Sequence, residues 1–134
     1  MAYLLDTNVI SELRKRKPHG AVLSWIQKLP EESIRVSAVT LGEIQAGIER
    51  TREIDAPKAR ELEQWLNDLA DTTSILDVDA KVVRRWAVLM HRRPDHHSED
   101  ALIAATALVH DLIVATRNVA DFKPFGVKLV NPFD

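Results

Sequence analysis

Residues 3–13, YLLDTNVISEL, bring a short apolar run directly against three polar residues, Asp6, Thr7 and Asn8. One interpretation is architectural, because Asp, Thr and Asn are common where a helix begins. The other is chemical, because a carboxylate at the carboxyl end of a buried parallel strand lies where open α/β folds bind their ligands. The choice depends on where the other acidic residues of the chain fall.

Short apolar runs like the first recur along the chain and alternate with helical patterns. Runs rich in Val, Ile and Leu are predicted to be strands at 2–5, 34–38, 75–78, 113–116 and 127–130. Strands that alternate with helices in this way predict an α/β fold, in which a central parallel sheet of about five strands is flanked by helices on both faces.

Several connecting segments show helical patterns. The stretch from Pro18 to Pro30 is predicted to form a helix bounded by its prolines. The apolar stripes of two later helices are predicted to be Leu62, Trp65, Leu66 and Leu69 in the first, and Val83, Trp86, Ala87 and Met90 in the second.

Length and composition bound the kind of protein. The chain has 134 residues, of which 46% are hydrophobic, so it suits a single domain spanning residues 1–134. The absence of cysteine excludes disulfides, thiolate zinc sites and a thiol nucleophile. A formal charge of −2 gives no overall positive field that would indicate a nucleic-acid partner. No apolar run reaches the roughly 18 residues of a membrane helix, and no signal peptide is evident, which predicts a cytoplasmic protein without a membrane partner.

One helix stands apart because it has almost no polar side. Residues 101–109, ALIAATALV, are apolar around the circumference except for Thr106, so this helix is expected in the middle of the fold. Glu99 and Asp100 precede it. The structural interpretation is that Ser98 caps the helix and the acids complement its dipole. The functional interpretation is that a carboxylate at a recessed helix entry needs a partner or an ion.

Two further acids allow the same two interpretations. Glu43 lies in a predicted helix directly after a strand, and its position is well away from the apolar stripe of Leu41, Ile44 and Ile48. Periodicity alone therefore predicts an exposed glutamate at position 43. Asp121 lies just beyond the strand 113–116, where Asp often stabilises a turn.

The predicted topology limits which acids can meet. Asp6 ends the first strand, Glu43 follows the second and Asp121 follows the fourth. The helix 101–109 leads into strand 113–116, so Asp100 begins at the same edge, where the carboxyl ends of parallel strands lie. Four converging carboxylates would repel one another unless a cation lay between them. The sequence therefore predicts an all-oxygen site for Mg²⁺ or Mn²⁺, with Asp6 as a ligand and Thr7 and Asn8 starting the next helix.

Other chemistries fit less well. The chain offers no Ser/His/Asp triad and no Walker-type phosphate loop. His91, His96 and His97 could form a zinc site, but oxygen ligands favour Mg²⁺. A carboxylate-bound cation can activate water for attack on a phosphodiester and stabilise the leaving oxygen. In that scheme Asp6 and Asp100 are the principal ligands, while Glu43 and Asp121 complete the site or orient water.

Four stretches in series resemble the successive motifs of one family, and their order is as follows: LLDTNVISEL (4–13), VTLGEIQAGI (39–48), EDALIAATALVHDL (99–112) and TRNVADF (116–122) with GVKLVNPF (126–133). The chain is similar to the PIN-domain family from Tyr3 to Phe133, and most closely to the VapC and FitB-like toxins of toxin–antitoxin pairs. The acidic quartet of that family matches Asp6, Glu43, Asp100 and Asp121. Its polar helper residues match Thr116 and Asn118. Less typical of the family are Glu99, a spare ligand candidate, and the pair His96 and His97, whose use the sequence does not reveal.

The resemblance implies an activity and a set of partners. It implies an endoribonuclease that uses Mg²⁺ or Mn²⁺ and is inhibited by a cognate antitoxin of the VapB or FitA type. It also implies a homodimer, two of which are joined by antitoxin segments that supply the DNA contacts. The cations expected to guide the RNA backbone are Arg14, Lys15, Arg16, Lys17 and Arg117.

Two functions of other classes stay open. A phosphoacceptor signalling domain also places Mg²⁺ at strand ends, but it needs a second acid beside Asp6, for which only Asp77 and Asp79 are available. A non-catalytic partner-binding protein would keep the fold and have no use for the acids, all of which are present here.

Overall fold

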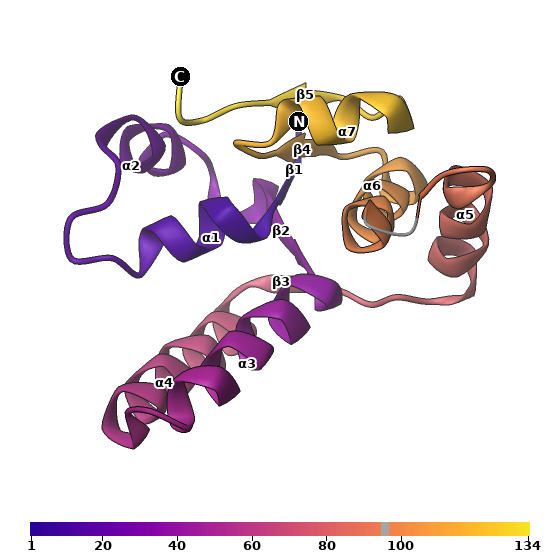
Figure 1. The fold of residues 1–134 in the computed structure, drawn as a ribbon. Coiled ribbons are helices and arrows are strands. Elements are labelled where there is room, and N and C mark those ends of the chain that lie inside the picture. Colours follow the sequence, from indigo (N-terminus) through magenta and orange to yellow (C-terminus); the bar gives the residue numbers. More distant parts are fainter. Residues whose placement is uncertain (95–96) are drawn as a thin grey trace.

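The computed structural model describes residues 1–94 and 97–134 and contains one parallel sheet (Figure 1). Its strands are β1 (Tyr3–Leu5), β2 (Ile34–Ser37), β3 (Ser74–Leu76), β4 (Ile113–Ala115) and β5 (Leu129–Val130). They lie in the order β3-β2-β1-β4-β5, and every neighbouring pair is parallel. The predicted five-stranded parallel sheet is confirmed.

Helices connect the strands. They are α1 (Thr7–Leu13), α2 (Gly20–Gln27), α3 (Ala38–Arg52), α4 (Ala56–Thr72), α5 (Ala80–Met90), α6 (Ser98–His110) and the short α7 (Val119–Phe122), with 3-10 turns η1 (Glu31–Ser33) and η3 (Lys123–Phe125). In the described part of the chain, no helix is both long enough and apolar enough to cross a membrane.

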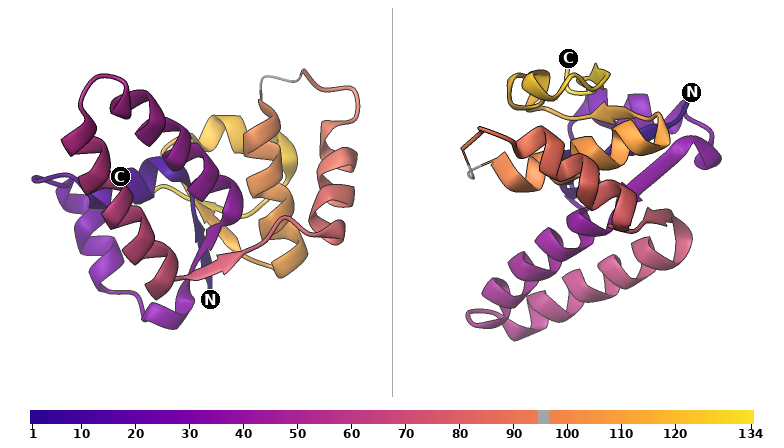
Figure 2. Two further views of the ribbon diagram at one scale, coloured as in Figure 1. Left: turned by 90° about the horizontal axis from the view of Figure 1, so that it is seen from below. Right: turned by 90° about the vertical axis from the view of Figure 1, so that its right-hand side faces the viewer.

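The central strands are buried on both faces. Successive side chains of a strand point to opposite faces, and Leu4 and Leu5 accordingly belong to different clusters. Leu4 and Val114 pack with α6 and with Phe122 of α7. Leu5 and Ala115 pack with apolar residues of α1 and α2. Helices therefore flank the sheet on both sides, as the sequence predicts (Figure 2).

The hairpin of α3 and α4 extends away from the sheet (Figures 1 and 2). Its own small core contains Ile48 of α3 and Ala59 and Leu66 of α4. The predicted α4 stripe is confirmed, because Leu62, Trp65 and Leu69 pack against this core.

The predicted stripe of α5 is wrong in two positions. Val83 is 43% exposed and Ala87 is also exposed, whereas Val82 is fully buried. Trp86, Leu89 and Met90 face the core instead. Val82 and Val83 start overlapping stripes that share positions 86 and 90, and the contact with α6 selects the one containing Val82 and Leu89.

Candidate functional site

Asp6 lies at the centre of the carboxyl edge of the sheet, where it ends β1 and precedes α1. Its backbone N–H donates to the Ala115 carbonyl at 2.9 Å, so the residue is still attached to β4. The residue is only 4% exposed. The Oδ1 atom accepts the N–H of Thr7 at 2.8 Å and caps α1. The architectural interpretation of the opening stretch is therefore correct, and it leaves Oδ2 directed at other partners.

The second oxygen of Asp6 receives donors from distant parts of the chain. The hydroxyl of Thr116, which is fully buried, donates to Oδ2 at 2.8 Å. The side-chain amide of Asn8 donates to the same oxygen at 3.2 Å. The backbone N–H of Asn118 in turn donates to the Thr116 hydroxyl at 2.9 Å. The segment after β4 thus orients Asp6, and Asn118 contributes to this network through its main chain.

Glu43 faces this edge from α3, contrary to the exposed position that periodicity predicts. The hydroxyl of Thr7 donates to its Oε1 at 3.0 Å, which joins α1 to α3. Burial raises the pKa of Glu43 to about 7, and the negative charges of Glu99 and Asp6 add to this effect against the Thr7 hydrogen bond. Sequence periodicity missed the position because the partner of Glu43 comes from another helix.

Asp100 lies in the first turn of α6 and meets Asp121 of α7. Together with His97, these residues offer ligand atoms that all lie within 4.8 Å of one another. The Nδ1 atom of His97 lies 3.8 Å from Oδ2 of Asp100. Burial raises the pKa of Asp100 to about 6, and the charges of Asp6 and Asp121 raise it further, while His97 opposes the shift.

The predicted capping role of Ser98 is wrong. The helix begins at Ser98 itself, and His97 occupies the N-cap position without a side-chain capping bond. Ser98 instead accepts a hydrogen bond through its carbonyl from the indole N–H of Trp86, at 3.0 Å. The first turn of α6 therefore carries Glu99 and Asp100 without a capping side chain.

The acidic residues act on one another electrostatically. The pKa of Asp6 is raised, mainly by burial, although the bonds from Thr116, Thr7 and Asn8 oppose this and the charge of Asp121 reinforces it. Each of Asp6, Glu43 and Asp100 therefore has a raised pKa to which at least one other acid of the group contributes. The structure brings the four predicted acids to one edge, with Glu99 beside them, and leaves their negative charge incompletely compensated.

The cations predicted to guide RNA differ in their surroundings. Arg14 to Lys17 follow α1 and are all exposed. Lys15 pairs with Glu12 at 2.8 Å. The guanidinium of Arg117 lies over the ring of Phe133, with its carbon 3.9 Å from the ring centre. No motif or periodicity singles out Glu12, a buried acid that also accepts the backbone N–H of His19. His96 lies outside the described residues.

Two hollows border the acids on different sides. One, of about 220 Å³, is lined by residues that include Asp121, His97 and Phe125. The other, of about 250 Å³, starts at Thr7 and Glu43 and runs between α1 and α3; we call it the α1–α3 groove. Each hollow is thus lined by one of the predicted acids, Asp121 in the first and Glu43 in the second.

Comparisons with known proteins agree with this architecture. The PIN domain family matches residues 3–124. The VapC ribonuclease Y4jK of Sinorhizobium fredii is 36% identical over 141 residues, covering 98% of this chain and 97% of that protein. The crystal structure of FitAcB from Neisseria gonorrhoeae superimposes on this chain with a TM-score of 0.87. The two sequences are 32% identical, and the match covers 98% of each chain. FitAB bound to an IR36 DNA fragment is 30% identical, with a TM-score of 0.77, covering 98% of this chain and 96% of that one.

These matches extend over nearly the whole chain, and the sequence and structure comparisons find the same group of proteins. The chain therefore belongs to the PIN domain family and, within it, to the group that includes the VapC ribonucleases and the toxin FitB.

Proposed function

We propose that this protein is a divalent-metal-dependent endoribonuclease and the toxin of a type II toxin–antitoxin pair. The observation that carries the proposal is the convergence of Asp6, Glu43, Asp100 and Asp121 on one edge of the sheet, with raised pKa values at the first three. Carboxylates that repel one another lower the stability of the fold, and groups with such perturbed pKa values cluster at functional sites. The names of the relatives support a ribonuclease and a toxin.

The side chains fit a hard divalent cation. Asp6 accepts three hydrogen bonds, whereas a carboxylate has about four lone-pair positions, so one remains for a cation. Asp100 and Asp121 offer oxygens close to each other. Mg²⁺ and Mn²⁺ prefer such oxygen ligands, and His97 would add a nitrogen that Mn²⁺ accepts more readily than Mg²⁺. When bound, the cation supplies positive charge that stabilises the transition state at phosphorus and acidifies water.

The residues of the chain then divide the work of hydrolysis. Asp6 and Asp100 hold the cation, and Asp121 completes its surroundings. Thr116 and Asn8 orient Asp6 through the hydrogen bonds to its Oδ2. Glu43 engages Thr7 through Oε1, which leaves Oε2 to take the proton from the attacking water. The pKa of Glu43 is raised to about 7 in the metal-free protein, and a bound cation would lower it and favour the carboxylate form that accepts a proton.

The partners follow from the same proposal. The substrate is RNA, and the antitoxin is of the VapB or FitA type, which would bring DNA binding to the complex. An antitoxin arginine can compensate the acid cluster in place of metal, because a guanidinium binds carboxylates in a bidentate manner. The resemblance further implies a homodimer, and a dimer of dimers in the antitoxin complex.

Cleavage of RNA by the purified chain tests the activity. Assorted RNAs are incubated with Mg²⁺, with Mn²⁺ and with EDTA, for the wild type and for Asp100→Asn. The matched control is Asp71→Asn, which changes an exposed aspartate on α4. We expect cleavage only with metal, retained by the control and abolished by Asp100→Asn. Cleavage in EDTA, or equal cleavage by Asp100→Asn, would refute the proposal.

Growth tests the biological role. Expression of the wild-type chain should arrest bacterial growth, and co-expression of the small neighbouring reading frame should relieve the arrest. Normal growth with an active, folded chain would contradict the toxin assignment. Uptake of phosphate from a small phosphodonor would favour the signalling-domain alternative instead.

A further inference from the structure

The α1–α3 groove has the same spacing on both of its walls. Thr7, Ser11 and Arg14 line it from α1 and the residue after it, and Glu43, Gly47 and Arg50 line it from α3. Each set follows the positions i, i+4 and i+7, which lie on one face of a helix. The two walls meet in the Thr7–Glu43 hydrogen bond of 3.0 Å at one end. Arg14 and Arg50 lie two helical turns away, about 10 Å along each helix axis.

Both arginines are available for a ligand. Within the described part of the chain, neither Arg14 nor Arg50 takes part in a salt bridge or a side-chain hydrogen bond, and both are exposed. Gly47 has no side chain on the α3 wall next to Arg50, and a Cβ added there would meet only the guanidinium of Arg50, at 3.6 Å. The far end of the groove therefore carries two cations without partners.

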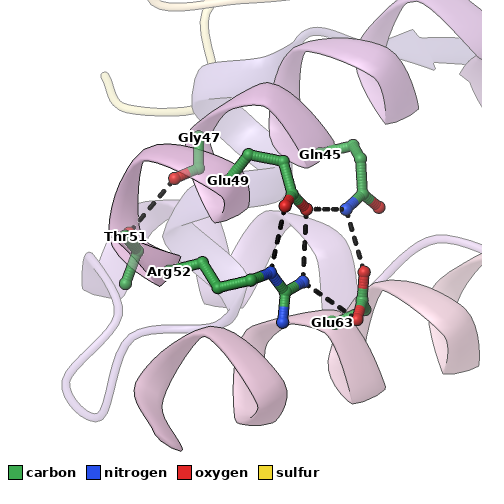
Figure 3. Close-up of polar contacts among 6 residues, drawn as sticks. All are labelled: Gln45, Gly47, Glu49, Thr51, Arg52 and Glu63. Atoms are coloured by element: carbon green, nitrogen blue, oxygen red, sulfur yellow. Dashed lines mark hydrogen bonds and ion pairs between the residues drawn. The ribbon is translucent and has the colours of Figure 1, made fainter. Parts of the chain in front are cut away.

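Two glutamates of α3 and α4 are paired with another arginine, Arg52, as Figure 3 shows. Arg52 contacts Glu49 of α3 at 3.0 Å and Glu63 of α4 at 3.0 Å. The amide of Gln45 donates to the same two glutamates at 2.7 and 2.9 Å. This network ties α3 to α4, and its single guanidinium compensates one of the two negative charges. Neither glutamate lines the groove, whose acidic lining residue is Glu43, at the end next to the acidic site.

We infer that the α1–α3 groove is a subsite for the RNA strand on one side of the scissile phosphate, with Arg14 and Arg50 binding a backbone phosphate. This inference rests on the proposed nuclease function. A single strand that passes over the acid cluster can enter the groove at Thr7 and Glu43 and reach the two guanidiniums at its far end. The floor includes Ile44 and the half-buried Trp65, which offer an apolar and aromatic surface to a base.

The charge of this groove favours an anionic ligand over a neutral or basic peptide. Two unpaired guanidiniums match a phosphodiester backbone, and arginine binds phosphate in a bidentate manner. Arg14 also differs from its basic neighbour Lys15 in being unpaired, because Lys15 forms a salt bridge with Glu12. Arg50, which no motif indicates, receives the same role as Arg14 because of its place in the groove.

Binding of a fluorescein-labelled single-stranded RNA oligonucleotide tests the subsite. Anisotropy is measured over a range of NaCl concentrations in an Asp100→Asn background that does not cleave. Arg14→Ala and Arg50→Ala should each weaken binding and flatten the slope of log affinity against log salt by about 0.7, the value for one lost phosphate contact on a single strand. Arg60→Ala, which removes an exposed arginine on α4, is the matched control and should leave the slope unchanged.

Two more variants separate charge from shape. Arg50→Lys keeps the charge and should retain most of the salt slope. Gly47→Leu fills the groove and should weaken binding without changing charge, with folding checked by circular dichroism. In the cleaving protein, Arg50→Ala should raise KM more than it lowers kcat.

The outcomes separate this inference from the proposed function. If the wild type cleaves RNA with metal while Arg14→Ala and Arg50→Ala bind with unchanged affinity and slope, the subsite is wrong and the nuclease proposal stands. If these variants lose the antitoxin and keep RNA binding, the groove binds protein and the inference is overturned. If the wild type does not cleave RNA under any metal condition, the proposed function itself fails.

Discussion

Replacement of Glu43 by Gln tests whether the acid cluster stores electrostatic repulsion. The variant keeps the size of the side chain and an oxygen that can accept the Thr7 hydroxyl, but it removes the charge. The pKa of Glu43 is raised from 4.5 to about 7, so the folded state holds a proton that the unfolded state releases between these values. The stability contributed by this proton is fully present below pH 4.5 and is lost as the pH rises through about 7.

The size of the effect follows from the shift and the exposure of the side chain. A rise in pKa from 4.5 to about 7 corresponds to about 3 kcal/mol for a group fully shielded from water. Glu43 is only half-buried, and solvent screening reduces the figure to about 1 kcal/mol. For a chain of 134 residues this is a change in melting temperature of about 3–5 °C.

Thermal melts in EDTA at pH 5.5 and pH 8.5 measure the effect. Because about two fifths of the contribution is already lost at pH 5.5, the wild type should lose about 2–3 °C more than Glu43→Gln between the two pH values. Glu61→Gln, which changes an exposed glutamate on α4, should follow the wild type. Addition of Mn²⁺ at pH 8.5 should restore more stability to the wild type than to Glu43→Gln. Equal pH dependence in the wild type and Glu43→Gln would refute the idea that Glu43 carries this repulsion.

Other substitutions probe different parts of the site and its surroundings. Asp100→Asn should leave the free energy of unfolding of the metal-free protein at pH 8 unchanged or raise it by up to about 1 kcal/mol. In thermal melts it should remove most of the stabilisation by Mn²⁺, and an unchanged metal response would exclude Asp100 as a ligand. Thr116→Val should destabilise the protein by about 1–3 kcal/mol at neutral pH in urea titrations, because buried Asp6 loses a donor, and the loss should shrink as Asp6 is protonated at low pH. Gly47→Ala should raise the free energy of unfolding by about 0.5–1 kcal/mol, because alanine is the better helix former and its Cβ meets no backbone; a loss of stability there would show that the groove wall is closely packed.

The sheet could be predicted from the sequence because its signal is local. Runs of Val, Ile and Leu between helical segments define strands, and each observed strand overlaps a predicted one. The convergence of Asp6, Asp100 and Asp121 could be predicted as well, because parallel strands place their carboxyl ends at one edge. Their roles as metal ligands stay predictions, since geometry alone does not identify an ion.

Side-chain environments that depend on a second element could not be predicted. Periodicity within α3 places Glu43 away from its apolar stripe, and only the arrangement of α1 brings Thr7 against it. The prediction of the buried stripe of α5 failed for a similar reason. Val82 and Val83 are equally apolar, and only packing against α6 distinguishes them. Ser98 was predicted to cap the helix because serine is common at that position. The prediction failed because capping depends on backbone geometry, which residue type alone does not specify.

The two interpretations of the opening stretch turn out to be compatible because a carboxylate has two oxygens. One oxygen of Asp6 caps α1 through Thr7, which is next in the sequence. The other accepts a hydrogen bond from Thr116, which is 110 residues away. The local bond fixes the side chain as soon as α1 forms, whereas the distant bond requires β4 to be paired with β1. The full arrangement of Asp6 therefore exists only when the sheet is complete, so that a partly folded chain would lack the oriented carboxylate on which the proposed nuclease depends.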